Sequence, residues 1–167
     1  MNKKVLLTSF TTWLPHQASN SSDDLLQVIS QIHAENSYLR QLPVDIELAS
    51  ELAIAKIQEL QPDTIICCGM AESRSQLSIE AQAMDGDDVL QTCVDLPQLI
   101  AGIDGIEISY DAGKFVCEGL YYSVLKYLQD YQMHTRCIFV HVPVINFDNS
   151  AAITTNFLSI LHRLTNL

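Results

Sequence analysis

Apolar positions along the chain follow two different periods. Continuous apolar runs over residues 64–68 (TIICC) and 137–142 (CIFVHV) are typical of strands that are buried on both faces. Elsewhere apolar side chains recur every three or four residues, as they do on the buried face of a helix. One such stripe consists of Ile46, Ala49, Ala53, Ile57 and Leu60. The pattern therefore predicts that strands and helices alternate.

The predicted elements follow from these periods together with capping and turn residues. Strands are expected over residues 4–9, 38–44, 64–68, 89–94, 106–110 and 137–142. Helices are expected over residues 25–34, 46–60, 77–84, 115–131 and 150–164, with a short turn or helix over 96–101. Alternating strands and helices predict an α/β fold, a single three-layer α/β/α domain over residues 1–167 on a largely parallel, open twisted sheet.

Composition narrows the class of protein. The 167 residues include 20 acidic and nine basic side chains, and 48% are hydrophobic. Such a chain is too apolar to be disordered throughout, and no apolar run approaches the roughly 18 residues of a membrane span. The acidic balance leaves no basic stripe for nucleic acid or for an anionic membrane surface. Polar residues interrupt the apolar N-terminal stretch, so we expect a first strand rather than a signal peptide, and a cytoplasmic protein.

The five cysteines do not predict a disulfide framework, because their number is odd and the chain reads as cytoplasmic. Cys67 and Cys68 are adjacent and would point to opposite faces of a strand, which argues against a shared zinc site. We expect Cys67, Cys68, Cys93 and Cys137 to be small buried side chains. Neither a cluster with metal-ligand spacing nor a glycine-rich phosphate loop occurs, so no cofactor is predicted.

Chemically useful side chains follow several of the predicted strands. Ligands of open α/β sheets bind beyond the carboxyl ends of the strands, and we expect four such ends to meet at one rim. These ends carry Phe10 and Trp13, residues 69–71, residues 111–113, and His141. The sequence therefore predicts an active site at this rim of the sheet.

Cys117 is the candidate nucleophile of that site. It is expected in the first turn of a helix, just after a glycine turn, where free N–H groups and the helix dipole favour a thiolate. His141 could act as its general base, and Glu80, expected on the loop after the third strand, could fix the histidine tautomer. The alternative is a buried core cysteine and a hydrogen-bonded core histidine.

Four segments together resemble the pyroglutamyl peptidases, also called pyrrolidone-carboxylate peptidases. They are KVLLTSFTTW with Asn20-Ser21-Ser22 after it, LPVDIELASELAIAKIQELQPDTIICCGMAESR, SYDAGKFVCEGLYY and FVHVP. Members of this family are cytosolic cysteine peptidases that remove an N-terminal pyroglutamyl residue from peptides. The last two segments are specific in combination, because residue types, spacing and order all agree.

The resemblance implies a role for each matched residue. Cys117 would be the nucleophile and its backbone N–H part of the oxyanion hole, His141 the general base, and Glu80 the residue that orients the histidine. The matched substrate-binding positions are Phe10, Trp13, Met70, Arg74, Phe115 and Val116. The implied substrates are N-terminally blocked peptides, and the mechanism needs no metal or organic cofactor.

The chain also departs from the family pattern. The loop over residues 9–14 lacks the family's glycines and proline, and Glu118 replaces an asparagine beside the nucleophile, where a carboxylate would raise the thiol pKa. Only 37 positions separate Glu80 from Cys117, so the resemblance implies a shortened member without the β arm that contributes to substrate binding and subunit contacts. A homo-oligomer is possible without this arm. Two alternatives stay open: an inactive binding or regulatory relative, and a different hydrolase or acyltransferase on the same scaffold.

Overall fold

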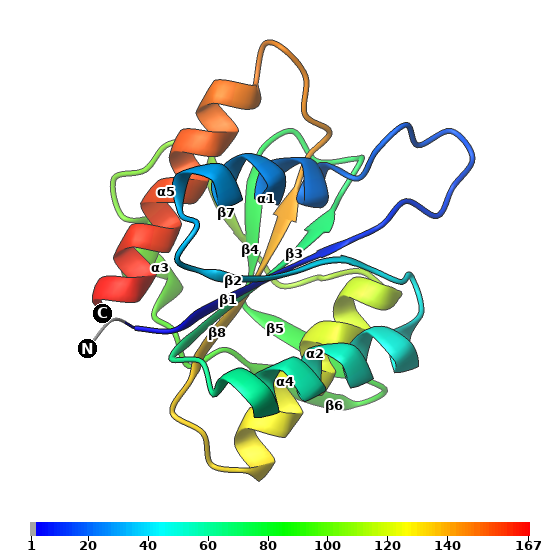
Figure 1. The fold of residues 1–167 in the computed structure, drawn as a ribbon, viewed down its shortest axis with the longest axis vertical. Coiled ribbons are helices and arrows are strands. Elements are labelled where there is room, and N and C mark those ends of the chain that lie inside the picture. The colour runs from blue at the N-terminus through cyan, green and yellow to red at the C-terminus, as the bar shows by residue number, and fades with distance from the viewer. Residues whose placement is uncertain (1–2) are drawn as a thin grey trace.

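A six-stranded sheet forms the centre of the computed structural model, which describes residues 3–167 (Figure 1). Its strand order is β2-β1-β3-β8-β4-β7. Four neighbouring strands are parallel: β2 (Ser37–Leu42), β1 (Val5–Phe10), β3 (Thr64–Met70) and β8 (Arg136–Val142). The other two, β4 (Leu77–Glu80) and β7 (Ile106–Ser109), are parallel to each other but run opposite to β8. The predicted largely parallel sheet is confirmed.

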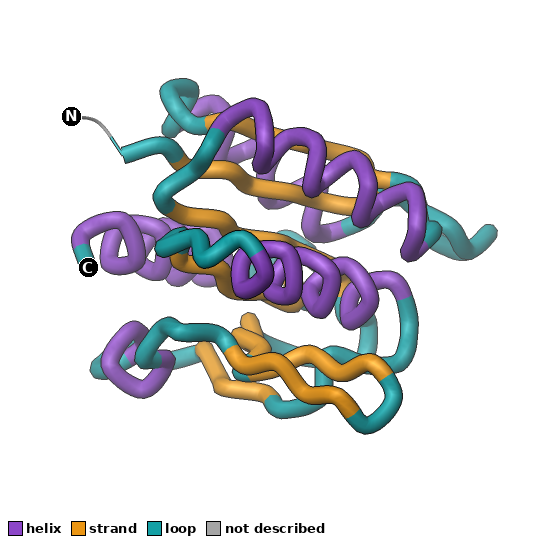
Figure 2. The backbone as a smooth tube through the Cα atoms, turned by 90° about the horizontal axis from the view of Figure 1, so that it is seen from below, coloured by secondary structure: helices purple, strands orange, loops and turns teal. Residues whose placement is uncertain are grey.

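Helices cover both faces of this sheet, which confirms the three-layer arrangement (Figures 1 and 2). One layer contains α1 (Ser21–Ile32), the short α3 (Leu96–Ile100) and α5 (Ser150–Asn166). The other contains α2 (Ile46–Leu60) and α4 (Val116–Asp130). Each layer encloses its own apolar core against the sheet, so the parallel strands are buried on both sides, as their continuous apolar runs predict.

Of the four cysteines predicted to be buried, three are buried in the structure. Cys67 packs into the core beneath α2 and α4, whereas Cys68 packs into the core beneath α1 and α5, as expected for neighbours in a strand. Cys137 is also buried. The prediction for Cys93 was wrong: it is exposed, because it follows the last strand of a surface hairpin rather than lying inside a sheet strand.

The helix predicted over residues 77–84 does not form. The segment instead forms β4 and then β5 (Gln82–Asp85), which pairs antiparallel with β6 (Asp88–Gln91). Leu77 and Ile79 pack into one core of the sheet, so the apolar period here is two rather than 3.6. The hairpin turns at Gly86, whose φ of 59° lies in the left-handed region.

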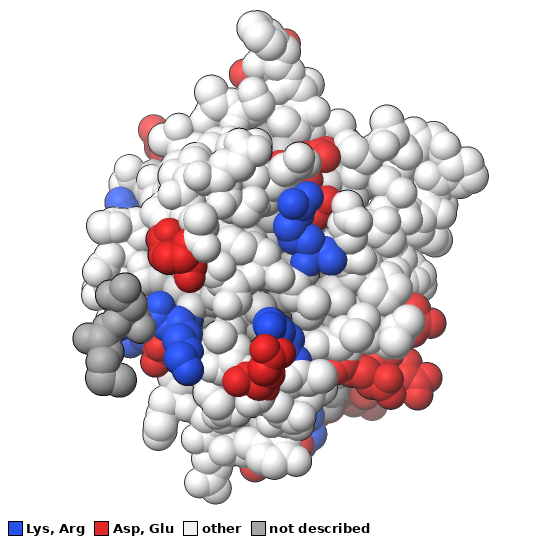
Figure 3. All heavy atoms as spheres, in the orientation of Figure 1, with Lys and Arg blue, Asp and Glu red and all other residues white. Residues whose placement is uncertain are grey.

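Within residues 3–167, no helix is both long and apolar enough to cross a membrane. Met1 and Asn2, the start of the N-terminal stretch considered above, lie outside the described residues, and from Val5 onward that stretch forms β1. On the face shown in Figure 3, the basic side chains stand apart from one another and form no stripe.

A buried carboxylate joins the first helix to the edge of the sheet. Asp23 in α1 accepts hydrogen bonds from Ser9 Oγ of β1 (2.7 Å), Arg40 Nε (2.8 Å) and Gln41 Nε2 (3.0 Å) of β2. Burial alone would raise the pKa of Asp23, but the hydrogen bonds from Arg40, Ser9 and Gln41 hold this pKa below its usual value. The same helix end carries Asn20, whose side chain accepts from Ser22 N.

We expect Asp23→Ala to lower the free energy of unfolding at pH 7 by about 3 kcal/mol, because it leaves Arg40 and Ser9 without their acceptor. Since the folded pKa of Asp23 is depressed, its contribution is present above the unfolded pKa and is lost as pH falls through the folded value. Urea unfolding at pH 7 and at about pH 3 should therefore show a smaller penalty in acid. The control is Asp24→Ala, because the Asp24 carboxylate accepts one side-chain hydrogen bond, from exposed Ser19. Equal penalties for both variants would contradict this role.

Candidate active site

Cys117 lies in the first turn of α4, as the sequence predicted. The preceding turn is shaped by Asp111, whose Oδ1 accepts from Gly113 N (3.0 Å), and Gly113 has a φ of 93°. The thiol sits directly over Gly69 of β3: a Cβ built on Gly69 would lie 2.5 Å from Cys117 Sγ and 2.9 Å from Phe139 Cζ. Only a glycine therefore leaves room for the sulfur above the sheet.

His141 projects from the same face of the sheet at the adjacent strand. In the parallel pairing of β3 with β8, His141 is the register partner of Gly69, and register partners direct their side chains to the same face. The ring of His141 is almost fully buried and lies 4.9 Å, between centroids, from that of Phe139. The sheet thus brings the imidazole beside the position that Cys117 occupies.

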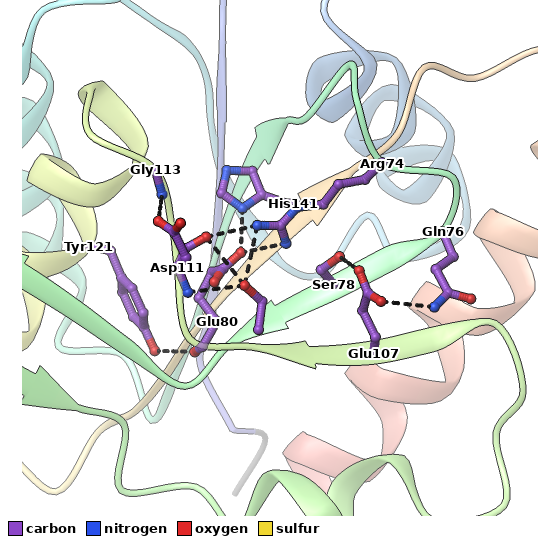
Figure 4. Close-up of polar contacts among 10 residues, drawn as sticks. Arg74, Gln76, Ser78, Glu80, Glu107, Asp111, Gly113, Tyr121 and His141 are labelled. Atoms are coloured by element: carbon purple, nitrogen blue, oxygen red, sulfur yellow. Dashed lines mark hydrogen bonds and ion pairs between the residues drawn. The ribbon is translucent and has the colours of Figure 1, made fainter.

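Glu80 holds the buried side of this imidazole (Figure 4). Its Oε1 lies 2.6 Å from His141 Nδ1 and also accepts from Arg74 Nη1 at 2.7 Å. Arg74 Nη2 donates to Ser109 Oγ (3.2 Å) and to the backbone oxygen of Asp111 (2.8 Å). An ionised carboxylate only accepts hydrogen bonds, so this pairing places the proton on Nδ1 and leaves Nε2 with a free lone pair.

The strand directions differ from the expectation that all the carboxyl ends meet at one rim. Glu80 is the last residue of β4, not part of a loop, and it pairs with Phe139 of β8 and Ser109 of β7. Because β4 and β7 run opposite to β8, they reach the site from the far rim of the sheet. Tyr121 links α4 to β4, because its hydroxyl donates to the backbone oxygen of Glu80 (3.1 Å).

A cavity of about 220 Å³ opens beside Cys117. Its lining is Phe10, Trp13, Leu14, Gln17, Asn20, Val44, Met70, Glu72, Val116 and Cys117. Four of the six predicted substrate-binding residues, Phe10, Trp13, Met70 and Val116, are therefore part of it. A larger cavity of about 580 Å³, between the hairpin and the end of α4, shares none of these residues.

The other two predicted substrate-binding residues, Phe115 and Arg74, are not among the lining residues of this cavity. Phe115 packs its ring on Trp13, with 4.9 Å between centroids and 36° between planes. Arg74 is bound to Glu80, as described above. Four further lining residues were not predicted from the sequence, because they belong to loops without a periodic signal: Leu14, Gln17, Val44 and Glu72.

Comparisons with known proteins agree with this geometry. A family model described as pyroglutamyl peptidase matches residues 98–159, which include Cys117 and His141. Pyrrolidone-carboxylate peptidase 1 of Caldanaerobacter subterraneus is 24% identical over 85% of this chain and 83% of its own length. Pyrrolidone-carboxylate peptidase of Bacillus subtilis is 27% identical over 87% and 80%. The chain is thus similar to the pyroglutamyl peptidases over most of its length.

Solved structures of pyroglutamyl peptidases share the fold. The crystal structure of pyroglutamyl peptidase I from Bacillus amyloliquefaciens matches with a TM-score of 0.85 at 23% identity, covering 99% of this chain and 96% of that one. Pyrrolidone carboxyl peptidase from Thermococcus litoralis matches with a TM-score of 0.81 at 16% identity, covering 98% and 94%. The architecture is therefore preserved although more than three quarters of the residues differ.

The loop over residues 9–17 is held by polar contacts. Gln17 Oε1 accepts from the backbone N–H groups of Trp13 (3.1 Å) and Leu14 (3.2 Å), and Gln17 Nε2 donates to Glu72 Oε1 (2.6 Å). His16 Nε2 lies 3.0 Å from Glu72 Oε2. The hydrogen bonds from His16 and Gln17 lower the pKa of Glu72. These contacts fix the loop where the family's glycines and proline are absent.

The segment in which the family resemblance implies a missing arm contains the short β5–β6 hairpin. This hairpin packs against α4, where Glu118 Oε1 accepts from Met84 N (3.2 Å) and the Tyr122 hydroxyl donates to Asp88 Oδ2 (2.6 Å). Glu118 therefore points toward the hairpin rather than toward the thiol. In residues 3–167, no group of three or more His, Cys, Asp or Glu side chains could hold a metal ion.

The environment of Cys117 raises the pKa of its thiol to about 12. Burial is the largest cause and the Glu80 carboxylate the next, while Arg74 acts in the opposite sense. The expectation that the helix terminus yields a thiolate in the free protein is therefore not supported. The carboxylate that affects the thiol is Glu80, and Glu118 is not among the causes.

We expect Glu80→Gln to lower the pKa of Cys117, because it removes a negative charge and leaves the opposing charge of Arg74. The pH profile of Cys117 alkylation should move to lower pH in this variant. Glu118→Gln is the matched control, and its profile should coincide with that of the parent chain. A downward shift in Glu118→Gln and none in Glu80→Gln would show that Glu118, rather than Glu80, raises the thiol pKa.

We expect Gly69→Ala to lower the free energy of unfolding by about 1–3 kcal/mol, because its methyl group overlaps Cys117 Sγ and Phe139. The same substitution in a Cys117→Ala background should cost less, since the sulfur is gone. Urea unfolding of the four chains of this double-mutant cycle measures the coupling. Identical costs in both backgrounds would show that the sulfur does not occupy the space above Gly69.

Proposed function

We propose that this chain is a cysteine omega-peptidase that releases an N-terminal pyroglutamyl or related small acyl group from peptides, with Cys117, His141 and Glu80 as its triad. The observation that carries the proposal is the buried 2.6 Å contact between Glu80 and His141, on the sheet face where Cys117 and a small cavity meet. The similarity to pyrrolidone-carboxylate peptidases supports the reaction class. All three residue types required for activated thiol catalysis are present in one place.

The proposed reaction begins with proton transfer from Cys117 Sγ to His141 Nε2. The thiolate attacks the carbonyl carbon of the blocked residue, and the resulting oxyanion is stabilised by the N–H of Cys117, which lies in a first helical turn without an intrahelical acceptor. The carbon–nitrogen bond then breaks as His141 returns the proton to the leaving amine. Water, deprotonated by His141, hydrolyses the thioester, which releases the acid and restores the thiol.

The raised pKa of Cys117 fits a general-base mechanism. A thiol with a pKa of about 12 is protonated at neutral pH, so the attack requires a base, His141, to take the proton from Cys117 Sγ. Glu80 stabilises the imidazolium that forms, and Arg74 compensates the buried carboxylate between turnovers. His141 thus carries the proton, and Glu80 fixes the orientation of its ring through Nδ1.

The remaining attributes belong to the same proposal. The chain acts as one domain over residues 1–167 in the cytoplasm. Its substrates are N-terminally blocked peptides, and it needs no cofactor. A homo-oligomer that does not use the family's arm is compatible with this function. Among the contacts of residues 3–167, none favours the inactive binding or regulatory alternative. The different hydrolase or acyltransferase would use the same three residues.

The test is hydrolysis of a fluorogenic pyroglutamyl amide. We expect Cys117→Ala and His141→Gln to lower kcat at least about 10³-fold, and Glu80→Gln to lower it about 10²- to 10⁴-fold, as for other orienting carboxylates. Cys93→Ala, which removes the exposed cysteine, should leave turnover unchanged. Folded protein that hydrolyses no small-acyl amide would contradict the proposal, as would turnover that survives Cys117→Ala.

A further inference from the structure

The larger cavity, here called the second cavity, lies at the opposite end of α4 from Cys117. Three parts of the chain enclose it: strand β6 of the hairpin, the last turns of α4, and the turn that leads from α4 into β8. Its volume of about 580 Å³ falls within the roughly 300–1,000 Å³ that is typical of small-molecule sites. The second cavity is therefore large enough to hold a ligand of its own.

Hydrogen bonds hold the walls of the second cavity in place. Thr92 Oγ1, at the end of the hairpin, donates to the backbone oxygen of Cys137 in β8 (2.6 Å). In the turn after α4, Met133 N donates to Leu128 O (2.9 Å), and Thr135 Oγ1 donates to Pro62 O (2.7 Å). The walls are thus tied to one another and to the sheet, so the cavity is formed before any ligand binds.

The lining of the second cavity is uncharged. Leu90 of β6, Leu125 and Leu128 of α4, and Cys137 of β8 supply an apolar floor. Of the described residues 3–167, no aspartate, glutamate, lysine or arginine lines it. Burying an ion without a partner is costly, and the net charge of −11 repels anions from the whole chain. The cavity therefore suits an uncharged ligand with an apolar body.

Four polar side chains of the lining are available to orient such a ligand. None of the four has a hydrogen-bond partner in the part of the chain that the structure describes, and they are Gln91, Gln129, Gln132 and His134. In the cavity beside Cys117, by contrast, Gln17, Asn20 and Glu72 are all hydrogen-bonded within the protein. A primary amide both donates and accepts, so the glutamines complement a ligand that carries a donor and an acceptor.

We propose that the second cavity is a non-catalytic binding site for a small, uncharged molecule that combines an apolar body with an amide or sulfonamide group. The elements around it are those that carry the proposed triad, since α4 bears Cys117, β8 bears His141, and the hairpin follows directly after Glu80. A ligand in this cavity contacts all three elements without approaching the thiol. The proposal does not depend on peptidase activity.

Dansylamide is the probe for this site. It is uncharged at neutral pH, has a naphthalene body, and carries a sulfonamide that both donates and accepts. Its fluorescence rises in apolar surroundings, so titration of the full chain should give a saturable signal with one site per chain. Dansyl sulfonate, which replaces the amide nitrogen with a charged oxygen, is the matched ligand, and we expect its Kd to be at least about 10-fold higher because no cation lines the cavity.

Two cysteines report where the probe binds. Cys93 lines the second cavity, whereas Cys117 lines the other one. Alkylation of both by iodoacetamide can be followed in one sample by mass spectrometry. At a dansylamide concentration of about three times its Kd, we expect alkylation of Cys93 to be about 4-fold slower, because only the unoccupied fraction reacts. The rate at Cys117 should not change.

Val89 allows the second cavity to be altered from its exposed edge. It lies on β6 and is exposed, so a substitution there leaves the core intact. Val89→Arg places a charged side chain at the lining and should raise the Kd of dansylamide at least about 10-fold. Val89→Thr is the matched uncharged control, and its Kd should stay within about 2-fold of that of the parent chain.

Four results would each overturn the proposal. They are the lack of a saturable dansylamide signal, equal binding of the amide and the sulfonate, protection of Cys117 in place of Cys93, and an unchanged Kd in Val89→Arg. None of these measurements uses turnover, so a failure of this proposal is distinguishable from a failure of the proposed peptidase.

Discussion

The contact between Glu80 and His141 is the constraint on which the site depends. A fully buried carboxylate is costly unless charge and hydrogen bonds compensate it, and here Arg74 and His141 share one of its oxygens. The other oxygen, Oε2, has no hydrogen-bond partner within the described chain. The strand order places β4 beside β8 so that this contact can form, and Tyr121 ties the strand to the helix that carries Cys117.

The sequence predicts the elements whose signals are local and misses those decided by tertiary packing. Residues 64–68 and 137–142 read as buried strands because both faces are covered, and the first turn of α4 follows from the glycine turn before Cys117. β4 has only four residues, too few to separate a period of two from a helical period. Its direction depends on pairing with β8, which no local pattern encodes.

The sequence predicts which residues lie together beside the cavity, but not their electrostatics. The motif order identifies Cys117, His141 and Glu80, yet the thiol pKa depends on burial and on which carboxylate faces it. Glu118 is adjacent in sequence but turned toward the hairpin, whereas Glu80 is 37 positions away and close in space. Arg74 was likewise predicted to bind substrate, whereas in the structure its guanidinium donates to Glu80.

The reversed pair of strands also has a consequence for how the chain acquires its native state. β4 and β7 leave the ribosome before β8, which is the strand that joins them to β3 in the finished sheet. In the finished sheet β8 alone joins the group β2-β1-β3 to the pair β4-β7, so without β8 each group would have an open edge. Since His141 lies on β8, the contact between Glu80 and His141 can form only once β8 has paired with β4, a non-local step of folding.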